Sequence, residues 1–298
     1  MTAKACLRSM RLRTLPLSLA GIVLGVLLAA GQQELRPLTV LLLALTTVCL
    51  QILSNLSNEL GDTLSGTDRS DRQGIHYSIQ DGEMTVPEMK RLIIFFACLS
   101  AAAGSAMVMS AFGTIRDPRA AAFLVLGAGA IWAAVHYTLG KNPYGYRGLG
   151  DIFVFIFFGL ATVCGSYYLS CLSWSPDILL PASAIGCFSV GVLNVNNIRD
   201  MKSDAATRKT VALRLGLRRA RIYQTALIAA GWVLMTVYAA MHCEGWLDFL
   251  YVATLGSFCV HLKGVWARED RALDPMLPML VFSAFLFAAM AGIGNLLS

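Results

Sequence analysis

The sequence ILSNLSNELGDTLSGTDRSD, at residues 52–71, joins the end of an apolar run to a group of acidic side chains. The run begins at Leu38, and no proline separates it from the acids. If a helix continues through this stretch, Asn55, Asn58 and Asp62 occupy positions i, i+3 and i+7 and share one face. The stretch therefore predicts polar ligands where a membrane helix meets water.

A second group of the same kind lies near residue 200. Asn196 and Asn197 end another apolar run, and Asp200 and Asp204 follow them. Ionised carboxylates at the edge of a membrane are costly unless they are paired or bind a cation. The duplicated pattern predicts that the two helix ends act together. A single acid in a polar loop, such as Asp81, is interpreted as an ordinary solvated side chain.

The composition indicates an all-α polytopic membrane protein. Hydrophobic residues make up 56% of the 298 residues and charged residues 14%, whereas soluble domains carry about 25% charge. A membrane helix needs about 20 apolar residues. We therefore expect one membrane domain over residues 1–298, surrounded by a lipid bilayer and binding no nucleic acid. The nine expected transmembrane helices, in one bundle, are 14–31, 37–56, 92–112, 120–139, 151–171, 178–196, 221–241, 246–262 and 276–297.

The distribution of Lys and Arg predicts the orientation of this bundle. With nine segments, 21 of the 24 basic residues fall on one side, and only Arg36, Arg116 and Arg119 fall on the other. Such a bias identifies the cytoplasmic face. We expect a cytoplasmic N-terminus, a periplasmic C-terminus and a location in the bacterial cytoplasmic (inner) membrane. Both acidic groups then lie on the inner face.

The residue types of the two groups favour Mg²⁺ and a phosphorylated substrate. Mg²⁺ takes oxygen ligands, retains several waters and commonly bridges carboxylates to phosphate. Two groups that face each other would hold it around a diphosphate, and nearby Arg and Lys would neutralise the remaining phosphate oxygens. This arrangement suits the ionisation of a prenyl diphosphate, in which pyrophosphate leaves and an allylic cation forms in a dry pocket.

The chain resembles the UbiA-type membrane prenyltransferases, which carry two acidic motifs. The first motif appears as NELGD at 58–62 and the second as NIRDMKSD at 197–204. Within that superfamily the chain is most similar to the 1,4-dihydroxy-2-naphthoate polyprenyltransferases of menaquinone synthesis. The stretches that carry this similarity are residues 11–16, 51–55, 61–68, 142–151, 194–200 and 208–216.

The resemblance implies a reaction and a set of site residues. A polyprenyl diphosphate would react with 1,4-dihydroxy-2-naphthoate, releasing pyrophosphate and CO₂ and giving demethylmenaquinone. Asp62, Asp200 and Asp204 would be the catalytic residues. The Mg²⁺ ligands implied are Asn58, Asp62, Asp68, Asn197, Asp200 and Asp204. Phosphate contacts are expected from Lys141, Arg199 and Lys209, and contacts to the aromatic acid from Arg13 and Tyr137.

The sequence departs from the family pattern in three places. Glu59 stands where an Asp is usual, Gly66 stands where the superfamily motif places its last Asp, and residues 75–77 read Ile-His-Tyr. One alternative function is the same fold with another aromatic acceptor, such as 4-hydroxybenzoate, although that branch keeps an acid at the position of Gly66. The other is a transporter, whose binding site would lie near the middle of the membrane.

Overall fold

The computed structural model describes residues 2–66, 78–205 and 208–298, and every regular element in these ranges is helical. The described residues contain nine helical segments that are long and apolar enough to cross a membrane, which confirms the predicted number. The main helix of each segment is α2 (Leu15–Ala30), α3 (Pro37–Leu64), α4 (Val86–Phe112), α5 (Pro118–His136), α7 (Thr162–Cys171), α8 (Leu179–Arg199), α11 (Leu217–Met241), α12 (Leu255–Ala267) and α13 (Met276–Leu297). Two of these helices are too short to span alone: α7 forms its segment (Gly150–Cys171) with α6 and η3, and α12 forms its segment (Trp246–Ala267) with η5.

Shorter helical pieces precede or connect these segments. The pieces are α1 (Ala3–Met10), η1 (Leu12–Thr14), η2 (Tyr144–Arg147), α6 (Gly150–Val154), η3 (Phe155–Ala161), η4 (Pro176–Ile178), α9 (Met201–Asp204), α10 (Val211–Leu215), η5 (Trp246–Thr254) and η6 (Asp270–Leu273).

Several helices extend further than their apolar runs predicted. Helix α3 begins at Pro37, where a proline suits the first turn, and continues to Leu64 rather than to residue 56. Helix α4 begins at Val86 because Thr85 and Glu88 form a reciprocal capping box. A boundary drawn from hydropathy stops where polar residues begin, whereas the backbone remains helical through Asn58 and Asp62.

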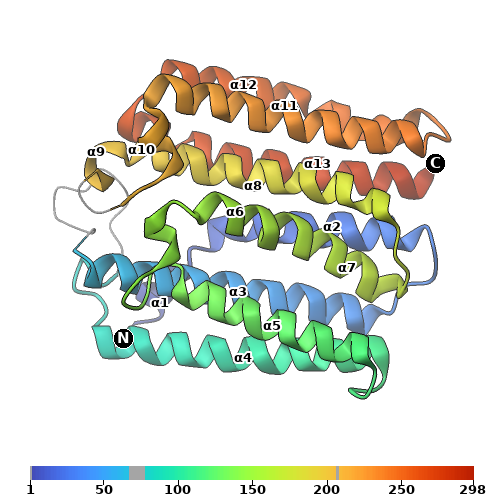
Figure 1. Ribbon diagram of the computed structural model, residues 1–298, viewed down its shortest axis with the longest axis horizontal. Helices are drawn as coiled ribbons and strands as arrows, with labels where there is room; N and C mark the ends of the chain where they lie inside the picture. Colours follow the sequence, from blue (N-terminus) through green and yellow to red (C-terminus); the bar gives the residue numbers. More distant parts are fainter. Residues whose placement is uncertain (1, 67–77, 206–207) are drawn as a thin grey trace.

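The helices lie side by side along the long axis of the molecule (Figure 1). The N-terminus, α9 and α10 lie at one end, and the C-terminus lies at the other. One buried core joins α1, α3 and α4, and a larger one joins α2, α7, α8, α11 and α13. This arrangement leaves the first acidic motif on α3 and the second at the end of α8, with the cavity described below between α3 and η3.

Candidate active site

Arg208 connects the two acidic motifs. Its guanidinium forms an ion pair with Asp62, and its Nε lies 3.8 Å from Oδ1 of Asp204. Tyr146 donates a hydrogen bond of 2.7 Å to the same oxygen of Asp62, and its ring lies 4.8 Å from the Arg208 Cζ. Asp62 and Asp204 are 4% and 1% exposed. The first motif and the second therefore meet at one buried cation.

The charges at this point fix the protonation of Arg208 and Tyr146. Burial alone would lower the pKa of Arg208, but the carboxylates of Asp62 and Asp204 outweigh burial and raise it. Burial raises the pKa of Tyr146 to about 12, and Asp62 contributes in the same direction. At neutral pH the arginine is charged and the phenol is protonated, so both act as donors to Asp62.

Asp200 is held by the residue before it. Arg199 donates from Nε to one carboxylate oxygen of Asp200 (2.8 Å) and from Nη2 to the other (2.7 Å). It also forms a 2.9 Å ion pair with Asp274. Asp200 caps the C-terminal end of α8. In this structure Arg199 orients a carboxylate of the second motif, and its expected contact with phosphate stays a prediction.

Tyr137 lies between the acidic motifs and the interior of the bundle. It lines the main cavity and also a smaller recess that includes Asn197 and Arg208. A Cβ atom on Gly145 would lie 2.6 Å from the Tyr137 carbonyl oxygen, and one on Gly150 would lie 2.8 Å from its hydroxyl. These glycines of the NPYGYRGLGD stretch therefore make room for the Tyr137 side chain.

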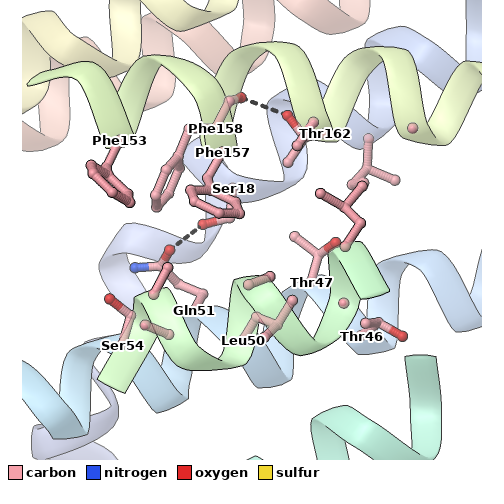
Figure 2. A pocket seen from close by; sticks show the side chains of 18 of the residues that line it. Ser18, Thr46, Thr47, Leu50, Gln51, Ser54, Phe153, Phe157, Phe158 and Thr162 are labelled. Carbon is pink, nitrogen blue, oxygen red and sulfur yellow. Dashed lines mark hydrogen bonds between the residues drawn. The ribbon is translucent and has the colours of Figure 1, made fainter. Parts of the chain in front are cut away.

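The main cavity has a volume of about 320 Å³ and a largely apolar lining from α2, α3, α5, α6, η3 and α7 (Figure 2). Asn58 of the first motif and Tyr137 belong to its lining. The cavity therefore extends from the acidic region into the membrane-spanning part of the bundle.

The other predicted site residues lie in several environments. Lys141, Lys209 and Arg13 are exposed. The Lys209 backbone N–H donates to the Tyr146 carbonyl (3.0 Å), which places Lys209 beside the Asp62 contacts. Arg13, in η1, is not among the described residues that line the cavity. Asp68 and residues 75–77 lie outside the described ranges.

Glu59, the departure in the first motif, belongs to a different part of the structure. Its side chain is fully buried, and Oε1 accepts a hydrogen bond of 3.0 Å from the backbone N–H of Ile79. Asn58, in contrast, lines the cavity. Consecutive helical residues point in different directions. Glu59 therefore points away from the cavity and binds the backbone at Ile79.

Arg208 and Tyr146 were not among the site residues predicted from the sequence. Arg208 is one of many basic residues between α8 and α11, and the signal that distinguishes it is its place at the start of the stretch 208–216, which carried the family resemblance. Tyr146 lies within a stretch that carried the family resemblance, which is the one signal that pointed toward it.

The donor set fits Mg²⁺ rather than a softer metal. Asp62, Asp200 and Asp204 offer carboxylate oxygens, and Asn58 and Asn197 offer amide oxygens. Within the described ranges no three Asp, Glu, His or Cys side chains gather closely enough to enclose an ion. Mg²⁺ commonly uses one or two carboxylates and completes its coordination with water and phosphate, so the residues present are compatible with it.

A bundle of membrane helices with two acidic motifs beside an apolar cavity is the architecture of a membrane-embedded prenyltransferase. The chain belongs to the UbiA prenyltransferase family, which matches residues 18–286. A 1,4-dihydroxy-2-naphthoate octaprenyltransferase of Escherichia coli is 41% identical to it, over 99% of this chain and 96% of that protein. A protein of the same name from Haemophilus influenzae is 36% identical, over 96% and 94%. The predicted resemblance is thus confirmed.

Solved structures share the fold. A UbiA homologue from Aeropyrum pernix aligns with a TM-score of 0.72 and 17% identity, over 94% of this chain and 96% of that one. A homologue from Archaeoglobus fulgidus, solved with DMAPP and Mg²⁺, aligns with a TM-score of 0.66 and 17% identity, over 97% and 99%. At this identity the likeness concerns the fold alone.

Proposed function

We propose that this protein transfers a polyprenyl group from a polyprenyl diphosphate to 1,4-dihydroxy-2-naphthoate in the bacterial cytoplasmic membrane. The observation that carries the proposal is the cavity, which begins at Asn58 of the first motif and continues between apolar helices. Such a site would receive the charged and the hydrocarbon parts of one substrate. The similarity to naphthoate octaprenyltransferases supports this choice of acceptor.

The diphosphate is expected at the end of the cavity where the two motifs meet. Mg²⁺ bound by Asn58, Asp62, Asp68, Asn197, Asp200 and Asp204 would supply positive charge to the leaving pyrophosphate. Arg208 is already charged and buried there, and exposed Lys209 lies beside it. Lys141 and Arg199 are further candidates for phosphate contact. Arg199 also keeps the Asp200 carboxylate in a fixed orientation.

The apolar part of the cavity would hold the prenyl chain and exclude water. Water would capture an allylic cation, so a dry pocket favours attack by the aromatic acceptor. Tyr137 stands between the two regions, and burial raises its pKa to about 12. Its neutral hydroxyl can donate a hydrogen bond to the aromatic acid, the contact expected of it.

The proposed reaction balances without an oxidant. The carbon–oxygen bond of the prenyl diphosphate breaks, and the electron pair leaves with pyrophosphate. The acceptor carbon that bears the carboxylate forms the new carbon–carbon bond. The bond to the carboxylate then breaks, CO₂ leaves, and its electron pair restores the aromatic ring. The direct product is therefore the quinol, and demethylmenaquinone is its oxidised form.

Release of CO₂ distinguishes the two aromatic acceptors. Attack on 4-hydroxybenzoate beside its hydroxyl occurs at a carbon that bears hydrogen, so a proton leaves and the carboxylate stays. Purified protein with a polyprenyl diphosphate, Mg²⁺ and carboxyl-labelled acceptor should release labelled CO₂ from the naphthoate, in step with pyrophosphate. Prenylation of the benzoate with its label retained, and no reaction of the naphthoate, would overturn the proposed acceptor.

A further inference from the structure

A fixed polar network lies on one wall of the largely apolar cavity. Gln51, on α3, is 8% exposed and lines the cavity. Its Oε1 accepts a hydrogen bond of 2.6 Å from Ser18 on α2. Its Nε2 donates to Thr14 and to Asn55, both at 3.1 Å. An amide has two N–H groups, so both donors of Gln51 are used and its orientation is fixed.

This network leaves acceptor atoms available at the cavity wall. The Ser18 proton is committed to Gln51, so the Ser18 oxygen can offer only lone pairs to a ligand. Ser54, three residues after Gln51 on α3, also lines the cavity. Figure 2 shows Ser18 hydrogen-bonded to Gln51 and Ser54 near Gln51. A ligand there is recognised by donating hydroxyl groups, which a prenyl chain does not have.

The opposite wall is aromatic. Phe153 of α6 and Phe157 and Phe158 of η3 extend toward the polar wall (Figure 2). Residues 155–161 form a π-helical turn, a feature frequent at functional sites. Aromatic rings favour stacked or edge contacts with another aromatic ring. The cavity at this level is therefore polar on one side and suited to a flat ring on the other.

The position of the polar wall also suits an acceptor. Gln51, Ser54 and Asn58 follow one another at helical spacing on one face of α3. With a rise of 1.5 Å per residue, Ser54 and Gln51 lie roughly 6 and 10 Å along the helix from Asn58. A ligand at the polar wall would thus be next to the bond that breaks when the diphosphate is bound at Asn58.

We propose that Ser18, Gln51 and Ser54 form the subsite for the hydroxyl groups of the aromatic acceptor, while Phe157 and Phe158 cover its ring. This inference rests on the proposed prenyl transfer and adds the residues that select and position the acceptor. Ser18 and Ser54 bind the ligand directly, and Gln51 is a positioning residue that fixes the Ser18 hydroxyl.

The test measures KM for each substrate separately. In Ser18→Ala, Ser54→Ala and Gln51→Leu, the KM for 1,4-dihydroxy-2-naphthoate should rise about tenfold, the effect of one lost hydrogen bond. The KM for the polyprenyl diphosphate should stay within about twofold because the tail makes no hydrogen bonds. The serine variants remove little volume, so they test the subsite even if Gln51→Leu folds poorly.

Gln224→Leu is the matched control. Gln224 is fully buried and, like Gln51, is hydrogen-bonded, in its case to Asn194 (2.9 Å) and His261 (3.0 Å), but it is outside the described cavity lining. Its loss should lower stability and leave both KM values near those of the wild type.

Two results would overturn the subsite. One is an unchanged acceptor KM in Ser18→Ala and Ser54→Ala, and the other is an equal rise of both KM values. If the wild type prenylates 4-hydroxybenzoate instead of the naphthoate, the proposed acceptor is wrong. The subsite is then tested with the benzoate: its KM should rise in the variants while the KM for the polyprenyl diphosphate does not, and any other result overturns the subsite. A wild type that prenylates neither compound overturns both proposals.

Discussion

At the scale of single residues, Arg208 is the cation that lets two acidic motifs from different helices lie together. It is about one tenth exposed and contacts Asp62, Asp204 and the Tyr146 ring. Removing one partner of a buried ion pair lowers the free energy of unfolding by more than the intact pair adds to it, because the remaining charge stays buried without its partner. Arg208 is therefore expected to matter for stability even without substrate.

The first prediction concerns Arg208→Ala. We expect it to destabilise the purified protein by about 3 kcal/mol or more, since two buried carboxylates lose their cation. The measurement is thermal denaturation in detergent. Lys202→Ala is the control, because Lys202 pairs with Asp270 at 2.6 Å but is 71% exposed, and exposed pairs contribute less than about 1 kcal/mol. Equal stability of the two variants would contradict this role of Arg208.

The second prediction concerns the carboxylates. Asp62→Asn and Asp200→Asn keep the size of each side chain but remove its charge. Each should lower Mg²⁺-dependent turnover by at least about 10², by analogy with the loss of one electrostatic stabiliser. Size-exclusion chromatography should show folded protein.

Asp81→Asn provides the comparison for these two variants. Asp81 forms a partly exposed ion pair with Arg8 (2.6 Å, both 32% exposed), outside the two motifs. The activity of the Asp81→Asn variant should remain near that of the wild type. If Asp62→Asn and Asp200→Asn also keep near-normal activity, the carboxylates are not the metal site.

At the scale of elements, the cavity depends on a close approach of η3 to α8. A Cβ atom on Gly159 would lie 2.5 Å from the Gly186 Cα and 2.7 Å from the Ala182 carbonyl oxygen. These are backbone atoms, which cannot rotate away as a side chain can. Because Gly159 and Gly186 have no side chains, the backbones of η3 and α8 can pack closely. This contact positions η3, whose Phe157 and Phe158 line the cavity.

The third prediction tests this contact. Gly159→Ala should destabilise the protein by about 1–3 kcal/mol, the usual effect of overpacking, and should lower activity by shifting the aromatic wall. Gly129→Ala on exposed α5 is the matched control, because a Cβ atom there meets no atom within 4 Å. Alanine favours helix by up to about 1 kcal/mol relative to glycine, so the control should be neutral or stabilising. A neutral Gly159→Ala in thermal denaturation would refute the close contact.

At the scale of the whole molecule, the termini lie at opposite ends of the bundle (Figure 1). The N-terminus shares its end with α9 and α10, near the second motif. This arrangement agrees with an odd number of membrane crossings. Which end faces the cytoplasm is still a prediction from the distribution of Lys and Arg.

The fourth prediction concerns this orientation. A reporter fused after Ser298 should show the activity of a periplasmic location. A reporter inserted between α8 and α11 should show the activity of a cytoplasmic location. The basic side of the bundle is retained inside because positive charges resist translocation. A cytoplasmic C-terminus would require that one of the nine segments does not cross the membrane.

The helical membrane class, the number of spanning segments and the two acidic motifs could be predicted from the sequence. Each rests on a property that is local in the chain. Apolar length requires a helix in lipid because backbone groups find no other partners there, and helical spacing places Asn58 and Asp62 on one face. These expectations needed no knowledge of which helices are neighbours.

Which side chains from distant segments meet could not be predicted and became clear from the packed helices. Arg208 reaches Asp62, Tyr146 donates to the same carboxylate, and Ser18 reaches Gln51. Glu59 and Asn58 are adjacent in sequence but serve different contacts. Such pairings depend on helix packing, in which glycines such as Gly159 set the distance between backbones. Composition and spacing along one helix do not contain that information.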